Sequence, residues 1–184
     1  MPQFTIPGLS ARQGSEVAKL LQKQLSTYTD LHLTLKHVHW NVVGPSFIGV
    51  HEMIDPQVIA VRGYADEVAE RIAALGASPQ GTPEAIIKDR AGDDDSIGRD
   101  TVEAHLGALD LVYTGVLGDL RQRIAGTEKL DAVTQDMLIG HARGLEQFQW
   151  FVRAHPGGTL ANAGATTEKT AARKAARATT SRRR

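Results

Sequence analysis

Residues 15–46 read SEVAKLLQKQLSTYTDLHLTLKHVHWNVVGPS, and this stretch decides the fold class. Its apolar side chains recur every three or four residues, at positions 21, 25, 28, 31, 35, 38 and 42. That spacing places them on one face of a helix. Gly44 and Pro45 end the pattern, and Ser46 is a suitable N-cap for a following helix. The stretch therefore predicts an amphipathic helix over about 15–43 that turns sharply into a second helix.

The rest of the chain continues as helices with one long interruption. The second helix is expected to end near residue 75, where Gly76 is a natural C-terminal stop. Residues 76–99 are rich in Gly, Pro and Asp and predict a long connection with one short helix inside it. Two more helices are expected over about 100–125 and 132–155, and no stretch alternates as a strand would. The pattern predicts an all-α protein, a four-helix bundle of the ferritin type with a long crossover between its second and third helices.

Charge separates an acidic body from a basic end. The chain has 184 residues, of which 21 are basic and 21 are acidic. Residues 156–184 hold seven basic residues and one acid, so this segment carries +6 and the remainder, with 14 basic and 20 acidic residues, carries −6. The small and polar residues after Pro156 predict a disordered basic tail. We expect an N-terminal arm over 1–14, a bundle over 15–155 and the tail over 156–184.

The basic side chains of the tail are candidates for binding DNA. They are Lys169, Arg173, Lys174, Arg177, Arg182, Arg183 and Arg184. No aromatic residue lies among them, so they can neutralise phosphates but cannot stack on bases. Binding is expected to be independent of sequence, sensitive to salt, and strengthened when one assembly carries many tails. A tail that only keeps the protein dissolved is the alternative.

The sequence lacks the features that identify several other classes of protein. The chain has no cysteine, which excludes disulfides, thiolate metal sites and cysteine nucleophiles. Residues 1–10 lack the basic and apolar regions of a secretory signal, and no apolar run is long enough to span a membrane. We therefore expect a cytoplasmic protein that does not contact membranes. The run His51-Glu52-x-x-Asp55 departs from the zinc-protease motif because an aspartate replaces its second histidine.

Five side chains of metal-ligating type lie around the predicted turn and along the second helix. They are His39, His51, Asp55, Asp66 and Glu70. At about 100° per residue the last four form one polar stripe beside the apolar stripe, which favours a subunit interface over the bundle centre. Asp55 and Asp66 are eleven residues apart, or about 16 Å along the helix, so one ion cannot bind to both within one chain.

This spacing divides the ligands into two half-sites. An antiparallel hairpin places His39 near His51 and Asp55, whereas Asp66 and Glu70 lie further along. A two-fold axis between antiparallel copies would join the first group of one chain to the second group of the other, twice over. Mixed imidazole and carboxylate ligands suit Fe(II). A solvated helix face is the alternative, and the proline that follows Asp55 could kink the helix there.

The stretch HVHWNVVGPSFIGVHEMIDPQ at 37–57, followed by DEVAER at 66–71, resembles the signature of the Dps family of mini-ferritins. It keeps the spacing His39-x11-His51-x3-Asp55-x10-Asp66-x3-Glu70, and FQWF at 148–151 also resembles the family. The resemblance covers residues 4–155. It implies a dodecameric shell in which these five ligands form ferroxidase centres between subunits. Such a shell oxidises Fe(II), preferentially with hydrogen peroxide, and stores the ferric mineral inside.

The resemblance also implies roles for other residues. The acids Glu128, Asp131 and Asp136 are candidates for lining three-fold pores that admit iron, with ordinary helix-terminus charges as the alternative. Trp40, beside His39, could take up stray oxidising equivalents, or it could be a core aromatic. The implied function is iron storage and DNA protection by a nucleoid-associated ferroxidase. A DNA-compacting nucleoid protein with a weak or vestigial metal site is the alternative, and a plain helical oligomer is a third.

Overall fold

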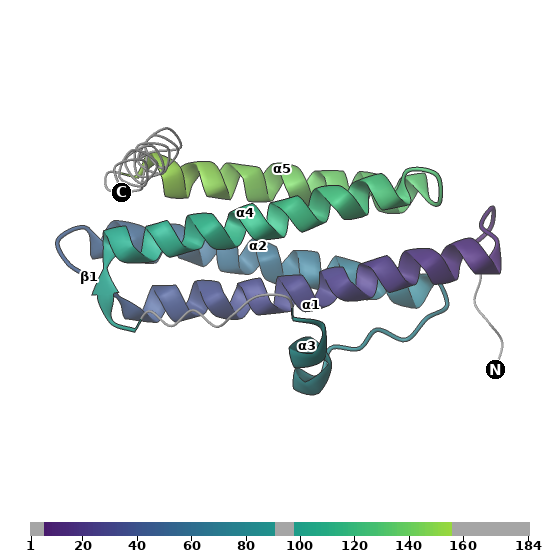
Figure 1. Ribbon diagram of the computed structural model, residues 1–184, viewed down its shortest axis with the longest axis horizontal. Helices are drawn as coiled ribbons and strands as arrows, with labels where there is room; N and C mark the ends of the chain where they lie inside the picture. Colours follow the sequence, from purple (N-terminus) through teal and green to yellow (C-terminus); the bar gives the residue numbers. More distant parts are fainter. Residues whose placement is uncertain (1–5, 91–97, 156–184) are drawn as a thin grey trace, which may run out of the picture.

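The computed structural model describes residues 6–90 and 98–155. Its helices are α1 (Ala11–Asn41), α2 (Phe47–Ala74), α3 (Pro83–Asp89), α4 (Val102–Thr127) and α5 (Ala132–Ala154). The antiparallel pair α1 and α2 packs against the antiparallel pair α4 and α5, and α3 lies against α1 (Figure 1). This arrangement confirms the predicted single-crossover bundle. In the part of the chain that the structure describes, no helix is long and apolar enough to cross a membrane.

The first helix begins earlier than its apolar pattern indicated. The Ser10 hydroxyl accepts a hydrogen bond from the Gln13 backbone N–H at 3.3 Å, and the Gln13 side chain accepts one from the Ser10 N–H at 3.1 Å. This reciprocal capping box satisfies two amide groups at the helix end and starts α1 at Ala11. Residues 11–14, which we expected in the N-terminal arm, are therefore helical.

Two very short strands, β1 (Val42–Val43) and β2 (Asp100–Thr101), add a feature that the sequence did not predict. They run parallel, with Val42 paired to Asp100 and Val43 paired to Thr101. Two residues are too few to show the alternation that identifies a strand. The pair holds the end of the crossover beside the α1–α2 turn, and Thr101 then caps α4 by accepting a hydrogen bond from the backbone of the first turn.

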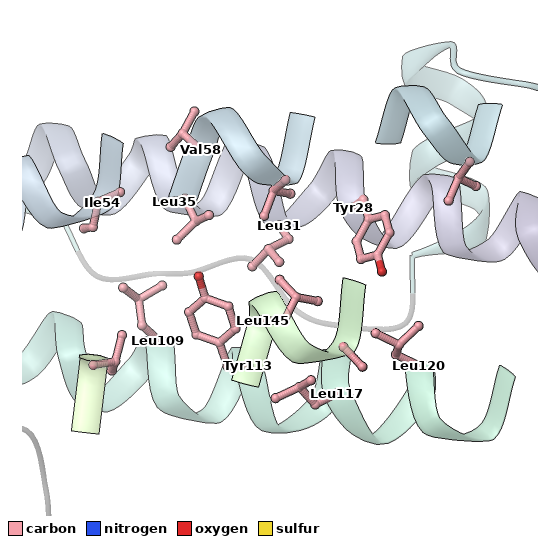
Figure 2. Close-up of a cluster of buried hydrophobic side chains, with 14 of the residues drawn as sticks. Tyr28, Leu31, Leu35, Ile54, Val58, Leu109, Tyr113, Leu117, Leu120 and Leu145 are labelled. Atoms are coloured by element: carbon pink, nitrogen blue, oxygen red, sulfur yellow. The ribbon is translucent and has the colours of Figure 1, made fainter. Parts of the chain in front are cut away.

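All four long helices contribute buried apolar side chains to one core (Figure 2). The seven apolar residues that the helical spacing placed on one face, at positions 21, 25, 28, 31, 35, 38 and 42, are all at most 5% exposed. Phe47, in the first turn of α2, is 42% exposed, whereas the other members of the apolar stripe of this helix are buried: Val50, Ile54, Val58, Val61, Val68 and Ile72. Burial of a leucine-sized side chain contributes about 1.5–3 kcal/mol. The two amphipathic stripes therefore supply much of the driving force that brings the helix pairs together.

One glycine of α5 is required by the packing. A Cβ atom at Gly144 would overlap the hydroxyl group of Tyr64. Because glycine has no Cβ atom, the Tyr64 ring fits against α5 and stacks on His141, with 4.3 Å between ring centroids. The helix propensity lost to a glycine, about 1 kcal/mol relative to alanine, is offset here by this close contact. The third long helix, expected to end near residue 125, continues through Gly126 to Thr127.

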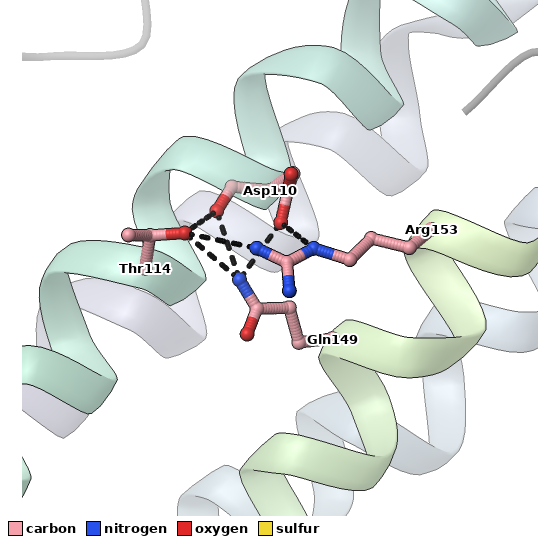
Figure 3. A network of polar contacts seen from close by, with 4 residues as sticks. All are labelled: Asp110, Thr114, Gln149 and Arg153. Carbon is pink, nitrogen blue, oxygen red and sulfur yellow. Dashed lines mark hydrogen bonds and ion pairs between the residues drawn. The ribbon is translucent and has the colours of Figure 1, made fainter. Parts of the chain in front are cut away.

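A polar network joins α4 to the C-terminal end of α5 (Figure 3). The Arg153 Nε donates to Asp110 Oδ1 at 2.7 Å. The Gln149 Nε2 donates to the same carboxylate oxygen at 2.7 Å and to the Thr114 hydroxyl at 2.9 Å. Hydrogen bonds that include a charged partner are stronger than neutral ones. The network therefore anchors the last turns of α5, the helix that precedes the tail.

Candidate metal centre

The turn between α1 and α2 brings three of the predicted ligands together. His39 lies in the last turn of α1, and His51 and Asp55 lie in the first turns of α2. One ligand atom from each residue lies within 4.8 Å of the others. The two imidazole rings stack, with 3.6 Å between centroids and 24° between planes. The first predicted half-site therefore forms within a single chain.

Reciprocal hydrogen bonds orient the two imidazoles. The His39 Nδ1 lies 3.0 Å from the His51 carbonyl oxygen, and the His51 Nδ1 lies 2.9 Å from the His39 carbonyl oxygen. Because a carbonyl oxygen only accepts, each neutral ring carries its proton on Nδ1. The Nε2 atom of each ring then keeps its lone pair. This is the arrangement usual for metal-ligating histidines, in which one nitrogen donates to a neighbouring group and the other binds the metal.

Asp55 is engaged by a lysine that the sequence analysis overlooked. The Lys36 Nζ lies 3.2 Å from Asp55 Oδ1, and the His39 Nδ1 lies 3.3 Å from the same oxygen. Half of the Asp55 side chain is exposed, so the carboxylate remains accessible. Lys36 also lies 5.7 Å from the centre of the Trp40 ring. Trp40 is 70% exposed in the single chain, so the prediction of a core aromatic is wrong there.

The second predicted half-site lies further along α2. Asp66 and Glu70 are both exposed. Asp66 follows Asp55 by eleven residues, or about 16 Å along the helix axis. One chain therefore cannot place both groups on a single ion. Pro56 lies inside α2, which is continuous from Phe47 to Ala74, and the first half-site still forms.

The three acids near the α4–α5 turn differ in their surroundings. Glu128 and Asp136 are exposed. Asp131 is buried and caps α5, accepting a hydrogen bond from the Val133 backbone N–H at 3.2 Å. Its carboxylate also accepts hydrogen bonds from the Thr134 hydroxyl and the Arg71 guanidinium. Asp131 therefore fastens α5 to α2 in this chain. The seven basic residues of the tail lie outside the described residues.

Asp131→Asn is expected to destabilise the protein at neutral pH and to reduce its sensitivity to acid. Burial disfavours the charge, but the hydrogen bonds from Thr134 and Arg71 outweigh burial and lower the pKa of Asp131. A carboxyl with a lowered folded pKa adds stability above its unfolded pKa of about 4, and this stability is lost as pH falls through the folded pKa. We expect the free energy of unfolding to fall by about 1–3 kcal/mol at neutral pH.

Urea unfolding of both proteins from neutral to acidic pH measures this effect. The exposed Asp136→Asn is the matched control and should leave the unfolding free energy nearly unchanged. An Asp131→Asn protein that loses as much stability on acidification as the unsubstituted protein would contradict the role assigned to this carboxylate.

Comparison with known proteins shows which family this chain resembles in sequence. The family model of the ferritin-like domain matches residues 18–158. The chain is 71% identical over 180 residues to the DNA protection during starvation protein of Mycolicibacterium smegmatis, which covers 96% of this chain and 98% of that protein. It is 32% identical over 151 residues to the protein of the same name in Agrobacterium fabrum, covering 80% of this chain and 91% of that one.

The solved structures agree with the sequence relatives. A tetragonal crystal form of Mycobacterium smegmatis Dps superposes with a TM-score of 0.83 at 72% identity, covering 89% of this chain and 97% of that chain. The match therefore extends over most of this chain and nearly the whole of the solved chain. This chain belongs to the Dps family of ferritin-like proteins.

Proposed function

We propose that the chain assembles into a dodecameric shell that oxidises Fe(II) at sites shared between subunits and stores the ferric product inside. The observation that carries the proposal is the preformed group of His39, His51 and Asp55. This group offers two oriented Nε2 atoms and one accessible carboxylate. A two-fold axis between antiparallel α2 helices would complete it with Asp66 and Glu70 from the partner subunit, forming two identical sites.

The ligand set suits both oxidation states of iron. Imidazole nitrogens bind ferrous iron well, and hard carboxylate oxygens favour the ferric product. Two Fe(II) ions each give one electron to one hydrogen peroxide molecule, whose O–O bond breaks, and the oxygen atoms end in water or in ferric oxyhydroxide. Transfer of both electrons to one peroxide molecule produces no hydroxyl radical. A site that holds two ferrous ions close together would therefore consume peroxide without releasing hydroxyl radical.

A second activity, binding of DNA through the tail, is supported by charge. Residues 156–184 carry seven basic side chains and one acid. Two relatives bear the name DNA protection during starvation protein. Twelve tails on one shell would contact a duplex at many phosphates, and this multivalency raises the overall affinity without any specific contact.

The test is Fe(II) oxidation by the assembled protein with peroxide and, separately, with oxygen. Light scattering should first give a mass near 12 × 19.8 kDa, or about 238 kDa. We expect faster oxidation with peroxide than with oxygen, and faster oxidation than in protein-free buffer. A monomer mass, or a rate equal to that of the buffer, would contradict the proposal.

Lys36→Met is expected to tighten binding of the first ferrous ion. The Lys36 ammonium contacts Asp55, so an arriving cation must displace it. Both side chains are partly solvated, and such pairs contribute about 0.2–1 kcal/mol, which corresponds to an increase in affinity of up to about fivefold. Anaerobic calorimetric titration with Fe(II) measures the change. Lys23→Met, an exposed lysine of the same helix, is the matched control, and equal effects of the two substitutions would contradict competition at Asp55.

A further inference from the structure

A buried polar chain crosses the bundle from α1 to α5 and α2. The Tyr28 hydroxyl lies 3.3 Å from His141 Nδ1, and His141 Nε2 lies 3.0 Å from Glu67 Oε2. Tyr28 is fully buried, the His141 side chain is 3% exposed, and the Glu67 side chain is 57% exposed. The chain therefore leads from a phenol in the core, through one imidazole, to a carboxylate at the surface.

The chemistry of the partners fixes the direction of each hydrogen bond. A carboxylate only accepts, so His141 Nε2 carries the proton and donates it to Glu67. His141 Nδ1 then has a free lone pair and accepts the hydrogen bond from the Tyr28 hydroxyl. Tyr28 thus donates to a basic nitrogen whose ring is already held in place from the other side. The Tyr64 ring stacks on His141 at 4.3 Å and completes its surroundings.

The same core contains a second buried tyrosine that serves as an internal comparison. Tyr113 lies on α4 and, like Tyr28, points into the core between the helix pairs (Figure 2). Its hydroxyl donates to Gln57 Oε1 at 2.6 Å. An amide oxygen accepts a hydrogen bond but does not take up a proton near neutral pH, whereas an imidazole does. The two tyrosines therefore share burial and differ in whether the partner is a base.

Because both tyrosines are buried, each can be oxidised only if its hydroxyl contacts a group that accepts a proton. Removal from water raises the pKa of both tyrosines far above the usual value for a phenol. Neither phenol is therefore deprotonated before it is oxidised. The radical cation of a phenol is a very strong acid, so loss of an electron in the core requires a proton acceptor at the hydroxyl. Tyr28 has one in His141, and the contact of Tyr113 is with an amide.

We propose that Tyr28 is a one-electron sink of the protein, with His141 as its proton acceptor. A hydroxyl radical, or another strong one-electron oxidant formed from iron and peroxide, takes one electron from the Tyr28 ring. The phenolic O–H bond breaks, and its proton moves to His141 Nδ1. The products are a neutral tyrosyl radical, an imidazolium that the Glu67 carboxylate stabilises, and hydroxide from the hydroxyl radical.

The position of the polar chain formed by Tyr28, His141 and Glu67 suits this function. Glu67, the surface end of this polar chain, directly follows Asp66 on α2, so the polar chain ends one residue along the helix from one half of the proposed iron site. A further Fe(II) ion can then return one electron to the tyrosyl radical while the imidazolium returns the proton, which restores Tyr28 and yields Fe(III). This role rests on the proposed ferroxidase function for its source of oxidant, but the sink itself does not require iron.

Electron paramagnetic resonance of the assembled, iron-free protein tests the sink directly. A ruthenium tris(bipyridine) complex, oxidised by a flash with a sacrificial acceptor, serves as the one-electron oxidant. The chain has three tyrosines, at positions 28, 64 and 113, so three Tyr→Phe variants assign any tyrosyl signal completely. Each substitution removes a single oxygen atom and keeps the ring. We expect Tyr28→Phe to lose the signal, and Tyr113→Phe and Tyr64→Phe to keep it.

The proton acceptor has its own variant. His141→Gln keeps a polar side chain at this position but removes the base, and formation of the radical should slow by about 100-fold. A signal that persists in Tyr28→Phe, or one that disappears in Tyr113→Phe or Tyr64→Phe instead, would overturn the proposal. So would an unchanged rate in His141→Gln. A parallel sample with Fe(II) and peroxide tests the ferroxidase function separately, because its failure would leave the iron-free result standing.

Discussion

Alanine at His51 or at Glu70 is expected to reduce Fe(II) oxidation by at least about tenfold, because even loss of a group that only orients a metal ligand costs about 10–100-fold. Each substitution removes one ligand from every site of a uniform assembly, although the two residues lie on opposite parts of α2. Stopped-flow absorbance of ferric product measures the rate. Glu52→Ala is the matched control, because Glu52 is an exposed acid next to His51 and is not among the proposed ligands.

Mixed assemblies show whether the two halves come from different chains. When the His51→Ala and Glu70→Ala proteins are dissociated, mixed in equal amounts and reassembled, half of the histidine groups and half of the acidic groups are intact. Random pairing then gives ½ × ½, or about one quarter, of the sites fully intact. We expect about a quarter of the unsubstituted activity to return. Co-assembly without any recovery would show that the two groups do not meet across subunits.

Truncation after His155 is expected to abolish most retention of DNA by the assembled protein. The truncation removes a net charge of +6, and non-specific binding to DNA is mainly phosphate neutralisation, so apparent affinity should fall by more than about 100-fold. Gel shift at low salt measures the loss once light scattering has shown that the truncated chain still assembles. Fe(II) oxidation should remain, because the proposed ligands all lie within the helices.

A charge variant separates the tail's chemistry from its length. Full-length protein with glutamine at the seven basic positions should bind as weakly as the truncated form. For the unsubstituted chain, one engaged tail with seven cations predicts a slope of about −6 in a plot of log affinity against log salt. Unchanged retention by the truncated shell would rule out the tail. Retention by the intact shell at several hundred millimolar salt would rule out the electrostatic mechanism.

The helices could be predicted from sequence because burial imposes a period on apolar residues. The stripe from Leu21 to Val42 is continuous, and the helix that carries it was predicted nearly in full. What apolar spacing could not show is a helix end set by polar atoms, and the Ser10–Gln13 capping box starts α1 before the apolar stripe does. The two-residue strands were not predicted either, because their pairing depends on residues far apart in the chain.

The first half-site could be predicted because its three ligands lie close together around one turn. His39, His51 and Asp55 lie within the 17 residues from 39 to 55, so the geometry of a helical hairpin alone brings them together. Lys36 was also within reach, since it lies three residues before His39 on the same helix. The contact of Tyr28 with His141 spans 113 residues and joins two helices that do not follow each other in sequence. No local pattern carries that information.

The central claim is that one iron site takes ligands from two chains, and anomalous X-ray diffraction tests it most directly. Crystals of the assembled protein would be soaked with Fe(II) without oxygen and measured at the iron absorption edge. The account predicts an iron peak beside Nε2 of His39 and His51 and the Asp55 carboxylate of one subunit, facing Asp66 and Glu70 from a two-fold partner. An iron peak enclosed within one bundle, with none at the subunit interface, would contradict it.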